Sequence, residues 1–149
     1  MRAVLQRVRE ASVTVDSQCV GQIAHGLLVY LGVAQEDTER DVLYVTDKLA
    51  ALRVFADEAG KMNLSVRDVA GAILLISNFT LYGDCRKGRR PSFDQAAHPS
   101  QAEPLYEAVA TGLRKQGVPV EQGQFGAMMQ VVSVNDGPVT FLLDSTKLW

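Results

Sequence analysis

Alternation of apolar and polar residues predicts a series of β-strands over the first part of the chain. The predicted strands are Ala3–Val8, Ser12–Val15, Cys19–Ile23 and Leu27–Val33. Short turn signals separate them, and Asp16-Ser17 is one of these. The chain is therefore expected to begin with consecutive strands rather than with a helix.

The pattern changes to a helical period at two later places. In the first, one apolar stripe is formed by Val42, Val45, Leu49 and Leu52. Thr38 together with Asp41 is an acceptable N-terminal cap for this helix. The second helix is predicted from a capping box at Ser100-Gln101-Ala102-Glu103, with Pro104 tolerated in the first turn. Its apolar positions are Leu105, Val109 and Leu113, and Gly117 is its expected C-terminal stop.

Between and after these helices the apolar runs again indicate strands. A turn is expected at Asp57–Gly60, and the further strands are Ala72–Leu81, Val118–Glu121, Met129–Asn135 and Val139–Asp144. Runs of strands with two separate helices indicate an α+β fold. We expect a strand-rich single domain over residues 1–149, with two main helices and a mixed, mainly antiparallel, barrel-like sheet.

The composition supports one globular domain and favours the cytosol as its compartment. The chain has 149 residues, of which 47% are apolar and 21% charged, and these values are ordinary for a globular protein. Cys19 and Cys85 form no disulfide framework, which favours free thiols in a reducing cytosol. No run approaches the roughly 20 apolar residues that span a bilayer. We therefore expect a soluble, cytoplasmic protein without a membrane partner.

The charge pattern contains one concentrated feature. A net charge of −2 argues against a general nucleic-acid coat protein. Four cations nevertheless lie within five residues: Arg86, Lys87, Arg89 and Arg90. Glycine and proline around them indicate an exposed loop. Two interpretations are open for this cluster, a solvated loop or a site for nucleic-acid phosphates.

The usual catalytic patterns are weak in this sequence. His25 and His98 are isolated from other ligand-type residues, so no metal site is predicted. No nucleophile-elbow motif is present. A catalytic Cys85 is not favoured, although it lies beside two cations. Thr80 has a hydroxyl but no evident base beside it in the sequence.

Two motifs resemble a known family when they are taken together. Asn135-Asp136-Gly137-Pro138-Val139-Thr140 includes residues between two apolar runs, where Asp136-Gly137 is typical of a hairpin turn. Pro138 weakens a simple two-residue hairpin because it has no N–H. Together with Ser77-Asn78-Phe79-Thr80, the Asn135–Thr140 segment resembles the Asn-X-Gly-Pro-Val-Thr and Ser-Gln-Phe-Thr motifs of the D-aminoacyl-tRNA deacylase family. The resemblance continues, in order, through Met1–Val8, Ala11–Val15, Gly26–Val33, Gly60–Asn63, Arg86–Phe93, Gly117–Val120 and Phe125–Ala127.

The resemblance implies a proofreading hydrolase that cleaves the ester of D-aminoacyl-tRNA and of mischarged glycyl-tRNA. It implies no metal and no organic cofactor. It also implies that the 2′-hydroxyl of the terminal adenosine helps to activate the attacking water. Ser77, Asn78, Phe79 and Thr80 would lie at the ester, with the Phe79 backbone N–H stabilising the oxyanion. Phe125, Met129 and Asn135 would line the substrate pocket.

The resemblance also implies a chirality filter formed between subunits. Gly137-Pro138 would be cis and would enter the active site of the other subunit of a homodimer, where it blocks an L side chain. Arg7 would hold this dipeptide in its orientation. In the same picture the basic cluster would dock on tRNA phosphate.

Two departures from the family pattern bear on the site. Asn78 replaces the usual Gln, and Met128 stands where Asp is common. Three alternatives to the main interpretation are a non-catalytic RNA-binding module, a general esterase that uses Thr80 or Ser77, and a relaxed-chirality relative with a trans Gly-Pro bond.

Overall fold

The fold is described by a computed structural model, which covers residues 1–148. Its elements follow in the order β1 (Arg2–Val15), β2 (Gln18–Ile23), β3 (Gly26–Gly32), α1 (Glu39–Ala51), β4 (Phe55–Ala56), β5 (Met62–Leu64), β6 (Ala72–Ser77), the 3₁₀ helix η1 (Phe79–Tyr82), α2 (Pro99–Lys115), β7 (Val120–Gln122) and β8 (Gln130–Asp144). This content of strands with two α-helices confirms the predicted α+β class.

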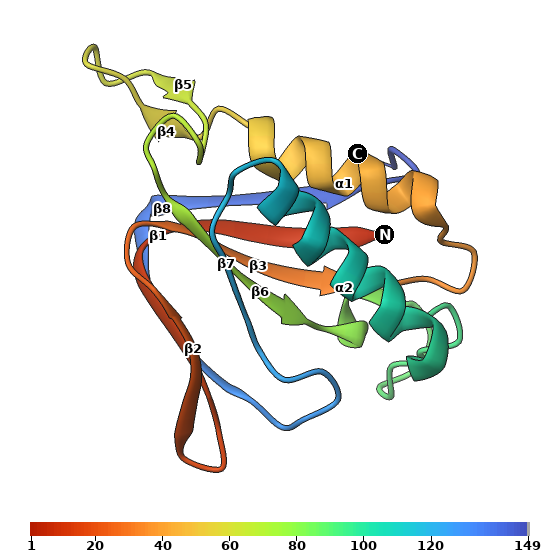
Figure 1. Cartoon of the computed structure of the whole chain (residues 1–149). Helices are drawn as coiled ribbons and strands as arrows, with labels where there is room; N and C mark the ends of the chain where they lie inside the picture. The colour runs from red at the N-terminus through yellow and green to blue at the C-terminus, as the bar shows by residue number, and fades with distance from the viewer. Residues whose placement is uncertain (149) are drawn as a thin grey trace.

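The main sheet is mixed. Its order is β2-β1-β3-β6-β7, and β8 pairs with the other side of β1. The pairs of β1 with β2, β3 and β8 are antiparallel, whereas β3–β6 and β6–β7 are parallel. Figure 1 shows β1 and β8 running side by side, with both α-helices over one face of the sheet.

The sheet curls until it is nearly a closed barrel, which confirms the barrel-like prediction. Gly21 of β2 lies against β7, and an added Cβ at this position would be 2.7 Å from the Gln122 carbonyl oxygen. Only glycine permits that approach of two backbones. The curl encloses a small apolar core inside the barrel, formed by Val8, Ala11, Val13, Ile23, Leu28, Leu74 and Ile76.

A larger core lies between the sheet and the helices. On α1, Val42, Val45 and Leu49 are buried as the stripe predicted, and the Thr38–Asp41 cap is also confirmed. On α2 the buried side chains are Ala102, Tyr106, Val109, Ala110 and Leu113. Leu105 is only partly buried, because Tyr106 takes the central position that the sequence pattern predicted for Leu105.

Several predicted boundaries are wrong. Ala3–Val8 and Ser12–Val15 are parts of the single strand β1. The strand predicted over Ala72–Leu81 ends at Ser77, and its remainder turns into η1. The capping box at Ser100 does not form, because α2 begins earlier, with His98 as N-cap and Pro99 in the first turn. Proline is favoured at this first helical position, where its missing N–H is not needed.

The hairpin expected at Asp136-Gly137 is also wrong. Residues 130–144 form one strand, β8, which follows β1 along nearly its full length. The register shifts between Gln6 and Val8, because Gln6 pairs with Thr140 and Val8 with Asn135. Residues 136–139 therefore bulge out of the strand opposite Arg7. We call this segment the β8 bulge; its Gly137–Pro138 peptide bond is cis.

Candidate active site

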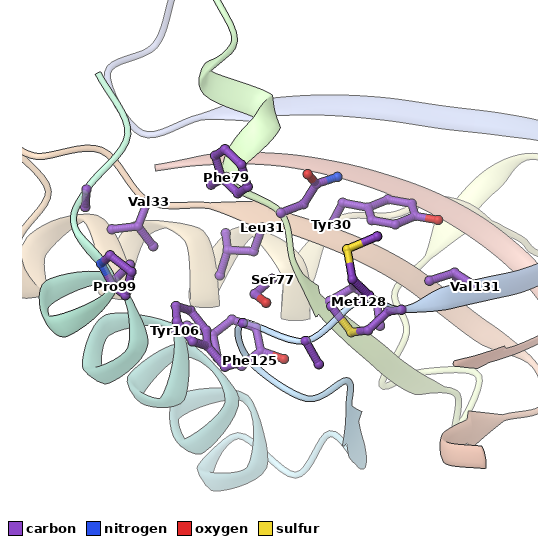
Figure 2. Close-up of a pocket in the computed structure, with 17 residues that line it drawn as sticks. Tyr30, Leu31, Val33, Ser77, Phe79, Pro99, Tyr106, Phe125, Met128 and Val131 are labelled. Carbon is purple, nitrogen blue, oxygen red and sulfur yellow. The ribbon is translucent and has the colours of Figure 1, made fainter. Parts of the chain in front are cut away.

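A pocket of about 640 Å³ opens where β3 and β6 end. Leu31 and Val33 reach it from β3 and its continuation, and Ile76 and Ser77 reach it from β6. The start of α2 and the segment before β8 form the opposite walls. Figure 2 shows Ser77 in the middle of the pocket, between Tyr106 and Phe125 on one side and Met128 on the other.

The pocket is uncharged. None of the 17 described residues that line it is acidic, basic or a histidine. Its polar side chains are Tyr30, Ser77, Asn78 and Tyr106. Burial raises the pKa of Tyr30 above its usual value, and it raises the pKa of Tyr106 to about 12. Both phenols are therefore protonated at neutral pH, and no side chain of the lining can act as a general base there.

The Ser77–Phe79 segment enters the pocket as β6 passes into η1. Ser77 is the last residue of β6, and the backbone N–H of Asn78 donates to the Leu31 carbonyl at 2.8 Å. The first hydrogen bond of η1 runs from the Leu81 N–H to the Asn78 carbonyl. The N–H of Phe79 precedes it and therefore has no acceptor within the 3₁₀ helix.

Thr80 lies beside the pocket but does not line it. Its hydroxyl donates to the side-chain oxygen of Asn78, which does line the pocket. Through this bond the shortened amide at position 78 has a defined partner. Met128, the other departure from the family pattern, lies at the rim with 92% of its surface exposed.

The remaining predicted residues fall into two groups outside the pocket lining. Arg7, Asn135, Gly137 and Pro138 meet at the β8 bulge. The four cations lie in the basic loop, residues 84–92, which is closed by hydrogen bonds between the backbones of Asp84 and Ser92. The structure thus brings together Ser77, Asn78, Phe79, Phe125 and Met129 around one pocket and separates the rest.

An aromatic pair connects the end of the basic loop to the pocket. Phe93, directly after the loop, packs edge-on against Phe79 with 5.0 Å between ring centroids. Within the loop, Arg86 binds Asp84, and this guanidinium lowers the pKa of the Asp84 carboxyl to about 2. No ion pair of Lys87, Arg89 or Arg90 is found among the described residues.

The sequence did not single out Tyr30, Tyr106 or Pro99, which also line the pocket. A signal for Tyr106 was available, since positions 102, 106, 109 and 113 repeat at helical spacing. No group of three or more histidine, cysteine or acidic side chains within residues 1–148 is arranged to hold a metal ion. Over the same residues, no helix is long and apolar enough to cross a membrane.

Solved structures share this fold. One, titled "c-Myc DNA Unwinding Element Binding Protein", superposes with a TM-score of 0.92 and 44% sequence identity over 97% of this chain and 98% of that chain. Another, titled as the structural analysis of a probable eukaryotic D-amino acid tRNA deacylase, gives a TM-score of 0.84 at 18% identity over 95% and 97%. The chain therefore shares the fold of these two proteins, which in this chain consists of a nearly closed mixed sheet and two covering helices.

The sequence comparisons identify the family within that class. The family model of D-Tyr-tRNA(Tyr) deacylase matches residues 4–144. D-aminoacyl-tRNA deacylases of Brevibacillus brevis and Halalkalibacterium halodurans are 61% and 58% identical over 145 residues, covering 97% of this chain and 100% and 99% of theirs. The chain belongs to the D-aminoacyl-tRNA deacylase family, and the prediction of a hydrolase of this type is confirmed.

Proposed function

We propose that this protein hydrolyses the ester bond of D-aminoacyl-tRNA, and of mischarged glycyl-tRNA, with help from the substrate's own 2′-hydroxyl. The observation that carries the proposal is the uncharged pocket beside Ser77-Asn78-Phe79. The lining that this chain provides offers no side-chain base to a bound ester, which supports a group of the substrate as the one that activates water.

In the proposed reaction a water oxygen attacks the ester carbonyl carbon, and the 2′-hydroxyl assists removal of the water proton. The Phe79 N–H stabilises the charge that develops on the carbonyl oxygen. The 3′-oxygen of the terminal adenosine then leaves and takes up a proton, which releases free amino acid and tRNA. Phe79, Phe125 and Met129 provide apolar walls that fix the substrate.

The chirality filter in this proposal comes from a second copy of the chain. Gly137 and Pro138 are exposed and lie outside the pocket lining of their own chain, so they reach an ester only in another subunit. Exposed apolar side chains lie on both sides of the β8 bulge: Val132, Val134, Phe141 and Leu142. Such a patch on an edge strand is suited to covering by a partner. The proposed assembly is a homodimer in which each bulge closes the partner's site.

Binding of the tRNA is assigned in this proposal to the basic loop, where Lys87, Arg89 and Arg90 are exposed. Phosphate contacts of this kind supply affinity without reading sequence. The Phe79–Phe93 pair connects the loop to the pocket, so a docked acceptor end lies near the ester site. A tRNA substrate supports a location in the cytoplasm.

The decisive experiment compares matched D- and L-tyrosyl-tRNA, and D-tyrosyl-tRNA ending in 2′-deoxyadenosine, with wild type and Thr80→Ala. We expect cleavage of the D substrate and essentially none of the L substrate. The deoxy substrate should be cleaved more slowly by about 10²–10⁴-fold, the usual effect of losing one positioned catalytic group. Thr80→Ala should keep much of the activity, because Thr80 itself does not line the pocket and its hydroxyl donates to the Asn78 side chain.

The alternatives give different results in the same assay. No release of free D-tyrosine would indicate a non-catalytic RNA-binding module. Normal turnover of the deoxy substrate together with a large loss in Thr80→Ala would indicate a general esterase. Similar rates on D and L substrates would indicate a relaxed-chirality relative.

A further inference from the structure

We propose that Asp136 is a positioning residue for chirality: its carboxylate fixes the direction of the β8 bulge by binding Arg7 and Arg9 together. The inference rests on the proposed function, in which the bulge is the part that rejects L substrates. It concerns a residue that lies next to the Gly-Pro dipeptide and outside the pocket lining of its own chain.

The base of the bulge is closed by Asn135. Its side-chain oxygen accepts from the Val139 N–H at 2.9 Å, and its side-chain nitrogen donates to the Val139 carbonyl at 3.2 Å. These two bonds join the ends of the bulge but leave its tip, Gly137-Pro138, without a side-chain polar group. Gly137 has φ of +142°, and an added Cβ would lie 2.6 Å from a Val139 methyl group. The base is thus fixed, while the direction of the tip depends on other contacts.

Asp136 supplies those contacts from two sides. Its main-chain carbonyl accepts from Arg7 Nε at 3.2 Å, and its carboxylate lies 3.3 Å from the same nitrogen. The other carboxylate oxygen accepts from Arg9 Nε at 3.1 Å. Arg7 in turn donates from Nη1 to the Val54 carbonyl at 2.7 Å. The bulge is therefore tied through Asp136 to β1 and, beyond it, to the connection between α1 and β4.

Arg7 and Arg9 differ in exposure, so salt should weaken their ion pairs with Asp136 to different extents. The side chain of Arg7 is 13% exposed, that of Asp136 28% and that of Arg9 75%. Salt screens the exposed Arg9 pair strongly and the Arg7 pair weakly. Loss of the carboxylate leaves Arg7 with its bonds to two carbonyls and removes the charge that faces it. The tip then gains freedom to swing away from the space that an L side chain would enter.

The test is the ratio of kcat/KM for D- and L-tyrosyl-tRNA, because effects on tRNA binding are common to both and cancel. Asp136→Asn keeps the size and the main-chain carbonyl but removes the charge. We expect its D/L ratio to fall about tenfold, the usual consequence of losing one hydrogen bond to a charged group. Arg9→Gln should lower the ratio two- to threefold at low salt and leave it at the wild-type value at high salt. The double variant should match Asp136→Asn.

Two matched controls accompany these variants. Asp16→Asn removes an acidic charge from the exposed β1–β2 turn, and Arg40→Gln removes an exposed arginine at the start of α1. Both should keep the wild-type ratio, and thermal unfolding should establish that every variant is folded. Arg9→Gln changes an exposed side chain, so it tests the inference even if Asp136→Asn is destabilised.

The outcomes are distinguishable. If wild type fails to discriminate D from L, the proposed function is wrong. If wild type discriminates and Asp136→Asn and Arg9→Gln both keep its ratio, the positioning role of Asp136 is wrong. Equal losses on D and L substrates, with a lowered unfolding temperature, would overturn the inference in favour of a merely structural role. A lowered ratio with the D rate retained supports it.

Discussion

Tyr106 shows how a single residue joins stability to the pocket. Its hydroxyl donates to the Leu75 carbonyl of β6 at 2.7 Å, and its ring lies 5.8 Å from that of Phe125. Only 1% of its surface is exposed. This side chain holds α2 against the strand that ends in Ser77, so the pocket wall and the core share one contact.

The stabilising contribution of Tyr106 should depend on pH in the alkaline range. Burial raises the pKa of Tyr106 to about 12, above the value of 10.0 expected when the chain is unfolded. Its contribution to the free energy of unfolding is complete below pH 10 and is lost as pH rises towards 12. Tyr106→Phe should unfold about 1 kcal/mol more easily at neutral pH, because it lacks the hydrogen bond, and should lose less stability above pH 10. Urea unfolding across this range measures both effects.

Tyr44→Phe, which changes a half-buried tyrosine on α1, is the matched control. Part of the alkaline loss should persist in Tyr106→Phe, since burial also raises the pKa of Tyr30 and of Tyr82. An unchanged slope above pH 10 in Tyr106→Phe would contradict the assignment.

At the scale of elements, the arginines of the basic loop differ in their ion pairing, and we expect them to differ in how much they contribute to tRNA binding. Arg86 is already paired with Asp84, whereas Arg89 and Arg90 are free of ion pairs among the described residues. Replacing Arg89 and Arg90 by Ala should weaken tRNA binding. The slope of log affinity against log salt should fall by up to about one for each phosphate that the variant no longer binds. Filter binding over a salt series is the measurement.

Arg86→Ala provides the internal comparison for this loop. Its charge is partly neutralised by Asp84, so the slope should change less than in the Arg89 and Arg90 variant. Cleavage of already bound substrate should be similar in all of them. An unchanged slope in the double variant would mean that the loop merely faces solvent.

Most elements could be predicted from residues that are close together in the sequence. Where the predictions were wrong, contacts between distant residues or an ambiguous local pattern were the cause. The Thr38–Asp41 cap and the α1 stripe depend on neighbours three or four residues apart, and they were predicted correctly. The hairpin predicted at Asp136-Gly137 does not form because β1 pairs with β8 on both sides of residues 136–139. That pairing joins residues more than a hundred positions apart, so no local signal reports it. The apolar run after Ser77 failed because a short run cannot distinguish a strand from a 3₁₀ turn.

The site followed the same rule. Ser77, Asn78 and Phe79 are consecutive, so a motif could indicate them together. The meeting of Phe125 and Met129 with that motif was expected from family resemblance, and Tyr30 and Pro99 carried no local signal. Contacts between Asp136 and the two arginines needed the register of β1 against β8, which the sequence does not state.

For the whole molecule, the proposed dimer makes a direct prediction. Val132 on β8 is 66% exposed, and we place it in the interface between subunits. Val132→Glu should give a monomer, because a buried unpaired carboxylate is strongly unfavourable. That monomer should be inactive on D-aminoacyl-tRNA, since it lacks the partner's bulge. Light scattering at the assay concentration, run beside the activity measurement, checks both points.

Leu43→Glu is a closely matched control. Leu43 is 64% exposed, but it lies on α1 rather than on β8. This variant should stay dimeric and active. A fully active Val132→Glu monomer would show that one chain carries a complete site.

The pairing of β1 with β8 has a consequence for folding during translation. β1 is synthesised more than a hundred residues before its partner β8, because residues 2–14 pair with residues 130–144. Until those late residues emerge, one edge of β1 is open and the β8 bulge does not exist. Helices and parallel strands can form before β8 is synthesised, but the barrel is completed only after residues 130–144 have emerged. A chain whose synthesis stalls before residue 130 therefore exposes the unpaired edge of β1. Unpaired strand edges of this kind promote aggregation and are protected by chaperones.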